Sequence, residues 1–86
     1  MLSPTMSQVE ADRLQREASA RIEGAERIAK QVDQEKLAPE QRETFLTIQS
    51  FLAKARAAVS AKDFERAVNL ADKAQILANE LPRIAP

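Results

Sequence analysis

The sequence contains no histidine, cysteine, tryptophan or tyrosine and only one glycine. General acid–base catalysis near neutral pH, without histidine or cysteine, would require a carboxylate or lysine whose pKa is strongly shifted by burial. No such residue stands out, because the aspartates fall on expected helix faces or at helix caps. The lack of cysteine also excludes disulfides and thiolate metal sites. We therefore expect a protein that is not an enzyme and that binds no cofactor and no metal.

Net charge is also lacking, because thirteen basic residues balance thirteen acidic ones and the two signs are interleaved. Binding to nucleic acid needs a basic surface, and binding to single strands uses exposed aromatic residues as well. The arginines available for it have acidic neighbours such as Asp12, Glu17, Glu23 and Glu26. We therefore expect no nucleic-acid partner. A nucleic-acid-binding helical domain is kept only as the alternative hypothesis for the function. Near-zero net charge also lowers the repulsion between copies of the chain.

Long hydrophobic runs are absent, and no window approaches the eighteen or so apolar residues of a membrane span. Residues 1–6 do not have the pattern of a signal peptide. Both the cytoplasm and a bacterial cell envelope, after removal of a signal segment, are compatible with the composition. At 86 residues the chain is expected to form one domain. We divide it into an N-terminal extension (1–6), a helical domain (7–81) and a C-terminal tail or linker start (82–86).

The apolar residues of the first third repeat with helical spacing. Ser7 followed by Glu10 has the pattern of a capping box, and Pro39 is expected to stop the run, which predicts a helix over residues 7–37. Acid-first pairs four residues apart predict ion pairs on its solvated face. These pairs are Glu17 with Arg21, Glu23 with Arg27, and Glu26 with Lys30.

Gly24 lies inside this helix, where glycine costs about 1 kcal/mol relative to alanine. Three uses of the missing side chain are open: close approach of another helix, a local bend and contact with a ligand. Close approach of a helix is the one we favour.

Two shorter helices follow. Pro39 suits a first helical position, and the apolar spacing after it predicts a helix over residues 40–61. Asp63 is a candidate N-cap for a third helix over residues 63–81, whose face is rich in alanine and which Pro82 ends. Loops this short place successive helices antiparallel to each other. The predicted fold is therefore all-α, an up-down-up three-helix bundle with a long first helix.

Small residues recur where the last two helices are expected to cross. The segment 63–67, together with Ala55, Ala58, Ala71, Ala74 and Leu77, resembles a tetratricopeptide-repeat hairpin over residues 49–82. Alanine replaces the glycine that this family usually has at position 55 and the aromatic residues that it has at 58 and 71. The resemblance implies a single helical hairpin with a protein-binding role, completed by the first helix. The whole chain is also similar to helical-hairpin domains of uncharacterised bacterial envelope proteins.

The first helix is longer than the hairpin, so residues before about 15 are expected to overhang. Three arrangements are open: Leu2 and Met6 fold back toward Phe64, two chains pair their overhangs as a homodimer, or the first two turns are frayed and solvated.

We expect a non-catalytic structural or protein-interaction helical module, self-associating or bound to a protein partner, within a longer bacterial protein. Two candidate interaction surfaces follow from the predicted helices. The residues are Val9 and Leu14 on the overhang, and Gln49, Arg56 and Ser60 on the outer face of the second helix.

Overall fold

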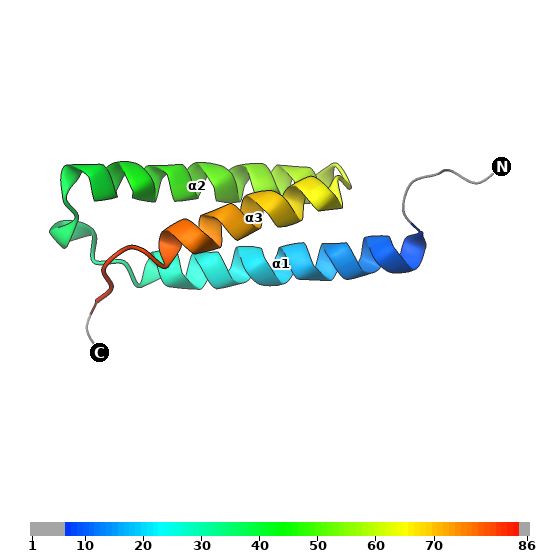
Figure 1. Cartoon of the computed structure of the whole chain (residues 1–86), viewed down its shortest axis with the longest axis horizontal. Coiled ribbons are helices and arrows are strands. Elements are labelled where there is room, and N and C mark those ends of the chain that lie inside the picture. Colours follow the sequence, from blue (N-terminus) through cyan, green and yellow to red (C-terminus); the bar gives the residue numbers. More distant parts are fainter. Residues whose placement is uncertain (1–6, 85–86) are drawn as a thin grey trace.

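The computed structural model of the chain describes residues 7–84, which form an all-α, up-down-up three-helix bundle (Figure 1). The helices are α1 (Gln8–Lys30), α2 (Pro39–Ser60) and α3 (Phe64–Ala78), and a 3-10 turn, Gln34–Lys36, lies between α1 and α2. The predicted fold class is confirmed. In the described part of the chain, none of the helices is both long and apolar enough to cross a membrane.

The third helix holds the bundle together. Figure 1 shows α3 running diagonally across the gap between α1 and α2, and it packs against both of them, whereas α1 and α2 share far fewer contacts. Its buried face is a row of alanines, which lets the backbones of both neighbours approach closely. The largest fully buried side chains are Ile48 and Leu52 of α2, and Leu70 is the one larger residue on the buried face of α3. The small residues behind the tetratricopeptide resemblance therefore lie at helix contacts.

The first helix is shorter than expected, because it ends at Lys30 rather than near residue 37. The chain leaves the helix to pair with the C-terminal segment: Val32 forms an isolated antiparallel bridge with Arg83. The backbone N–H of Ile84 donates to the carbonyl oxygen of Gln31 at 2.7 Å, and that of Asp33 to the carbonyl oxygen of Pro82 at 3.3 Å. Val32 is buried by this pairing instead of by a helical position.

The third helix likewise ends early, at Ala78 instead of near residue 81. Asn79 caps it, and two tight turns bring Leu81 into the core, where it is 6% exposed. Residues 82–84 then lie against residues 31–33. In the described part, the predicted tail is therefore packed against the helical domain.

The turn between α2 and α3 is a Schellman motif built on a lysine. Lys62 has a φ of 62°, and the N–H of Asp63 donates to the carbonyl oxygen of Ala58 at 2.8 Å. This hydrogen bond gives a partner to a carbonyl oxygen at the end of α2, and the turn reverses the direction of the chain. Asp63 is the N-cap residue of α3 by position, although its side chain makes no capping hydrogen bond.

The overhang of α1 is present. Figure 1 shows the N-terminal turns of α1 extending beyond the turn that joins α2 to α3. The first fully buried residue of α1 is Ala18, and Leu14 is half-buried. At the start of the helix the hydroxyl of Ser7 accepts the N–H of Glu10 at 3.2 Å, which is one half of the expected capping box. The proposed folding back of Leu2 and Met6 concerns residues outside the described part.

Candidate functional site

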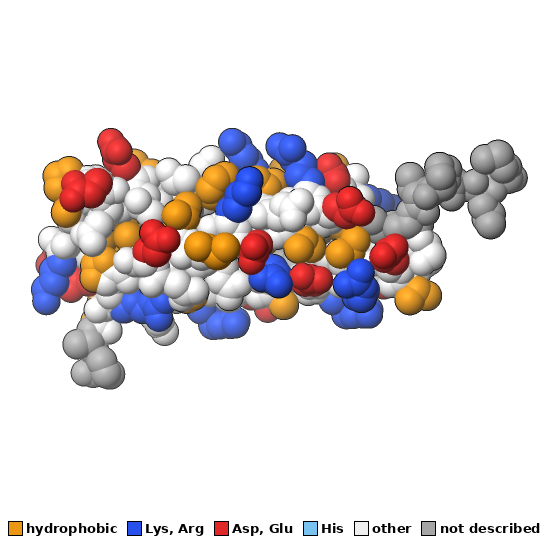
Figure 2. All heavy atoms as spheres, viewed as in Figure 1, with side chains coloured by type: hydrophobic (Ala, Val, Ile, Leu, Met, Phe, Trp, Pro, Cys, Tyr) orange, Lys and Arg blue, Asp and Glu red, His pale blue; other side chains and the backbone are white. Residues whose placement is uncertain are grey.

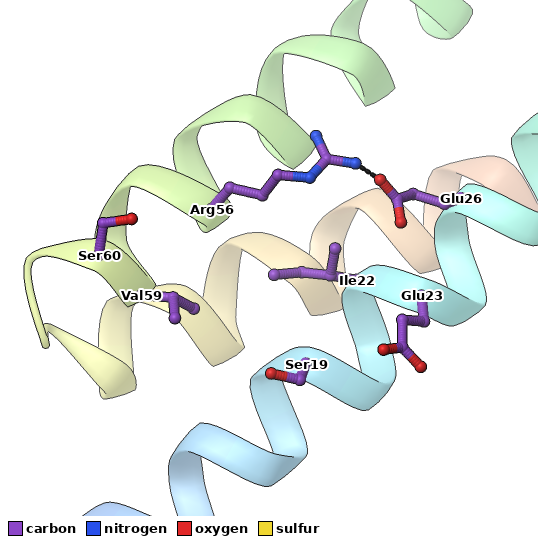
Figure 3. Close-up of a pocket in the computed structure, with 7 residues that line it drawn as sticks. All are labelled: Ser19, Ile22, Glu23, Glu26, Arg56, Val59 and Ser60. Atoms are coloured by element: carbon purple, nitrogen blue, oxygen red, sulfur yellow. Dashed lines mark ion pairs between the residues drawn. The ribbon is translucent and has the colours of Figure 1, made fainter.

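An open groove of the bundle lies between α1 and α2. Because the two helices share few contacts, a cavity of about 370 Å³ is left between them. Figure 3 shows this cavity with α3 behind it, so the groove lies on the side away from α3. It is lined by Ser19, Ile22, Glu23 and Glu26 of α1 and by Arg56, Val59 and Ser60 of α2.

The groove has an apolar floor and polar walls. Ile22 is 7% exposed and Val59 is half-buried, so both belong to the edge of the core. Arg56 extends from α2 and forms an ion pair with Glu26 of α1, as Figure 3 shows. Because both partners remain largely in contact with solvent, this ion pair stabilises the bundle only weakly. The remaining walls are made of two serines and a carboxylate, and they offer hydrogen bonds to a docked segment.

A second cavity, of about 240 Å³, lies near the other end of α2. It is lined by Gln34, Leu37, Arg42, Phe45 and Leu46. Leu37 is buried, whereas Leu46 is 64% exposed although it is one of the larger apolar side chains of the helix. An exposed leucine beside a cavity is apolar surface that a partner can remove from water.

The two cavities are connected by one stripe of α2. Residues spaced alternately by four and three positions lie on the same side of a helix. In α2 these residues are Arg42, Leu46, Gln49, Ala53, Arg56 and Ser60, and every one of them is exposed. We call this set the α2 strip. It runs the length of the helix and carries only two charges, both positive.

Three of the sequence-predicted residues belong to the α2 strip. Arg56 and Ser60 line the groove, and Gln49 lies on the same side of α2 two turns before Arg56. Sequence reasoning missed the α1 wall of the groove, Leu46 and Ala53. The alternating spacing of four and three positions within α2 is the sequence signal that could have indicated Leu46 and Ala53.

The overhang residues do not form a single surface. Val9 is 78% exposed and Leu14 is half-buried. Five residues of helix separate them, which turns their side chains about 140° apart around the axis of α1. Leu14 lies on the same line as the core residue Ala18, whereas Val9 lies on the outer side. Neither residue lines the groove.

The ion pairs of α1 differ in part from those expected. Glu17 pairs with Arg21 at 3.2 Å, as predicted, and Arg21 also reaches Asp72 of α3 at 2.7 Å. Glu26 pairs with Arg56 rather than with Lys30. Among residues 7–84 no ion pair joins Glu23 to Arg27. Two of the pairs therefore tie α1 to its neighbours.

Charges of both signs are mixed on the face that carries α3 (Figure 2). A third cavity, of about 380 Å³, lies along α3, and its charged residues are two acidic and two basic ones: Asp63, Glu65, Arg66 and Lys73. Within the described segment, no cluster of three or more acidic side chains is placed to hold a metal ion. This face has no dominant sign of charge, and the α2 strip remains the most distinctive surface.

Gly24 is buried against α3. A Cβ atom at this position would lie 3.2 Å from the side-chain nitrogen Nε2 of Gln75. The missing side chain leaves space for the side-chain amide of Gln75, and the nearest atoms at this position are all side-chain atoms. The favoured use, close approach of another helix, therefore involves this side chain and not the backbone of α3.

Comparison of the chain with models of protein families, with curated proteins and with solved structures found no match. Its function must therefore be inferred from its own residues and geometry.

Proposed function

We propose that this chain is a non-catalytic protein-interaction module that binds an α-helix of a protein partner along the α2 strip. The observation that carries the proposal is the strip itself: six exposed residues on one side of α2, flanked by an open cavity at each end. A helix docks into such a groove by placing side chains at positions i, i+3, i+4 and i+7 against it.

The composition of the strip supports binding to protein rather than continuous exposure to water. Leu46 offers an apolar anchor that is 64% exposed. Ala53, in the middle of the strip, is small enough to let a second backbone approach closely. Gln49, Arg56 and Ser60 supply hydrogen-bond donors and acceptors around this centre. A helix in the groove would cover Ile22 and Val59. It would pack against both α1 and α2, as α3 does on the other side of the bundle.

The proposal includes the biological setting predicted from the sequence, in which the module belongs to a longer bacterial protein. The resemblance of the α2–α3 hairpin to a tetratricopeptide repeat supports a protein-binding role.

Site-specific photo-crosslinking in the source cells tests this function. A photoreactive amino acid replaces Ala53 in the strip, and the control places it at Ala20, which is exposed on α1 and does not line the groove. Adducts are identified by mass spectrometry, including the crosslinked residue of the partner. We expect a defined adduct through position 53, joined to a helical segment, and none through position 20. Equal labelling from both positions, or no adduct from position 53, would contradict the proposal.

A further inference from the structure

We infer that the helix bound by the α2 strip is α2 of a second copy of this chain, packed antiparallel across a two-fold axis at Ala53. This inference rests on the proposed function and names the partner. A two-fold interface uses the same patch on both subunits, so the patch must be complementary to itself when one copy is reversed. Reversal about Ala53 exchanges the positions of Leu46 and Ser60 and brings Gln49 within one position of Arg56.

The centre of the strip allows close approach. With the axis at Ala53, the two Ala53 residues face each other, and their small side chains let the helices come near. Gln49 lies four positions before the axis and Arg56 three positions after it, so Gln49 of one copy comes near Arg56 of the other. The amide oxygen of the glutamine can then accept a hydrogen bond from the guanidinium group. Leu46 lies opposite Ser60 and beside Val59 of the second copy. Val59 thereby gives this exposed leucine an apolar contact.

The ends of the strip are complementary in charge. Arg42 lies eleven positions before Ala53 and Asp63 ten positions after it, so reversal brings Arg42 of one copy near Asp63 of the other. Both residues are exposed, and neither takes part in an ion pair among residues 7–84. Within one chain they lie at opposite ends of α2, about 30 Å apart at 1.5 Å per residue. The two-fold arrangement gives each of them an oppositely charged neighbour.

The size of the surface is sufficient for a reversible dimer. The contact runs the length of α2, about 33 Å, and is about 20 Å wide if it includes the neighbouring wall of α1. The resulting 600–700 Å² on each copy, roughly, falls at the low end of stable interfaces. The zero net charge of the chain removes long-range repulsion between the copies. We therefore expect a dimer that dissociates at about micromolar concentration.

A disulfide across the axis tests the geometry. The chain has no cysteine, so Ala53→Cys introduces a single thiol at the residue placed on the two-fold axis. A disulfide needs Cα atoms within about 7 Å, which only a residue on or near such an axis satisfies. Under mild oxidation we expect Ala53→Cys to form covalent dimers at least tenfold faster than the matched exposed variant Ala20→Cys. Equal rates would overturn the inference.

A charge exchange provides the second test. Size exclusion with light scattering, over a hundredfold range of concentration, should show the wild type rising from one to two chain masses. Arg42→Glu should raise the dissociation constant by about tenfold, because it places two acidic groups together at each end. Adding Asp63→Arg should restore the wild-type value, and because the two residues are far apart within one chain, a rescue can arise only between copies. No weakening by Arg42→Glu, or no rescue, would contradict the two-fold pairing.

Failure of this inference is distinguishable from failure of the proposed function. If the wild type is a monomer at every concentration and position 53 crosslinks in cells to a helix of a different protein, self-pairing is overturned and the function stands. If the wild type is a monomer and position 53 gives no adduct, both are overturned. A further variant, Ala53→Glu, should abolish the dimer and leave the helical circular dichroism unchanged. Its control, Ala20→Glu, should change neither.

Discussion

Gly24 shows how a single missing side chain adjusts the contact between α1 and α3. Helix propensity alone disfavours glycine at this position by about 1 kcal/mol. The structure places the amide of Gln75 in the space that a Cβ atom would occupy, at 3.2 Å from it. This amide is the far end of a flexible side chain, so it can move by a few tenths of an ångström. The glycine is therefore not required by the backbones of the two helices.

We expect Gly24→Ala to stabilise the protein by about 0.5–1 kcal/mol, because the gain in helix propensity exceeds the cost of shifting Gln75. Chemical denaturation followed by circular dichroism measures the change in the free energy of unfolding. The double variant Gly24→Ala with Gln75→Ala is the control, since it removes the side chain that must move. A lower stability of Gly24→Ala would mean that Gln75 cannot yield.

Ion pairs at the residue scale follow tertiary neighbours as much as helical spacing. Glu26 has Lys30 four residues later, the favourable order within a helix, yet it pairs with Arg56 of α2. The interaction of a pair on one exposed helix is worth only a few tenths of a kcal/mol. A neighbouring helix that presents a second partner can therefore redirect the side chain, and a single sequence does not show which neighbour will be present.

At the scale of elements, the helices start where the sequence indicates and end where the tertiary structure requires. Ser7 and Pro39 mark the starts of α1 and α2 by local chemistry, a side-chain cap and a fixed φ angle. The ends of α1 and α3 have no comparable signal. They are set by the pairing of residues 31–33 with residues 82–84, which lie about fifty positions apart in the chain.

We expect removal of residues 82–86 to destabilise the protein by roughly 1–2 kcal/mol. The truncation removes the hydrogen bonds from Ile84 to Gln31 and from Asp33 to Pro82, and each such bond contributes about 0.5–1.5 kcal/mol. It also exposes part of Val32, which is 3% exposed in the intact chain. Thermal unfolding followed by circular dichroism measures the effect. The substitution Arg83→Ala, which keeps the backbone, is the control, and an unchanged midpoint for the truncated chain would contradict the prediction.

For the whole molecule, the decisive feature is that the two longer helices, α1 and α2, both pack against the shorter helix α3. The alanine face of α3 contacts both α1 and α2, so its width determines how far apart these two helices lie. The groove on the opposite side is a consequence of that separation, because no other element among residues 7–84 covers α1 and α2 there. The candidate interaction surface thus depends on the core as well as on the residues that line it.

We expect Ala71→Leu, at a fully buried position of α3, to destabilise the protein by about 1–3 kcal/mol. The larger side chain forces apart the helices on either side of it, and a close-packed core accommodates extra methylene groups poorly. Urea denaturation gives the free energy of unfolding. Ala20→Leu, at an exposed position, is the matched control and should change the stability by less than about 0.5 kcal/mol. Equal effects of the two substitutions would mean that the α3 interface is not closely packed.

The three helices, their order and most of the core could be predicted from the sequence, because helical periodicity, N-terminal caps and proline are local signals. It also indicated Gln49, Arg56 and Ser60 as one side of α2, since helical geometry relates residues close in the chain. The folded chain was needed to show where α1 and α3 end, which partners the charged side chains have, and that a groove remains between α1 and α2. These features depend on contacts between residues far apart in the chain, and a single sequence carries no direct record of such contacts.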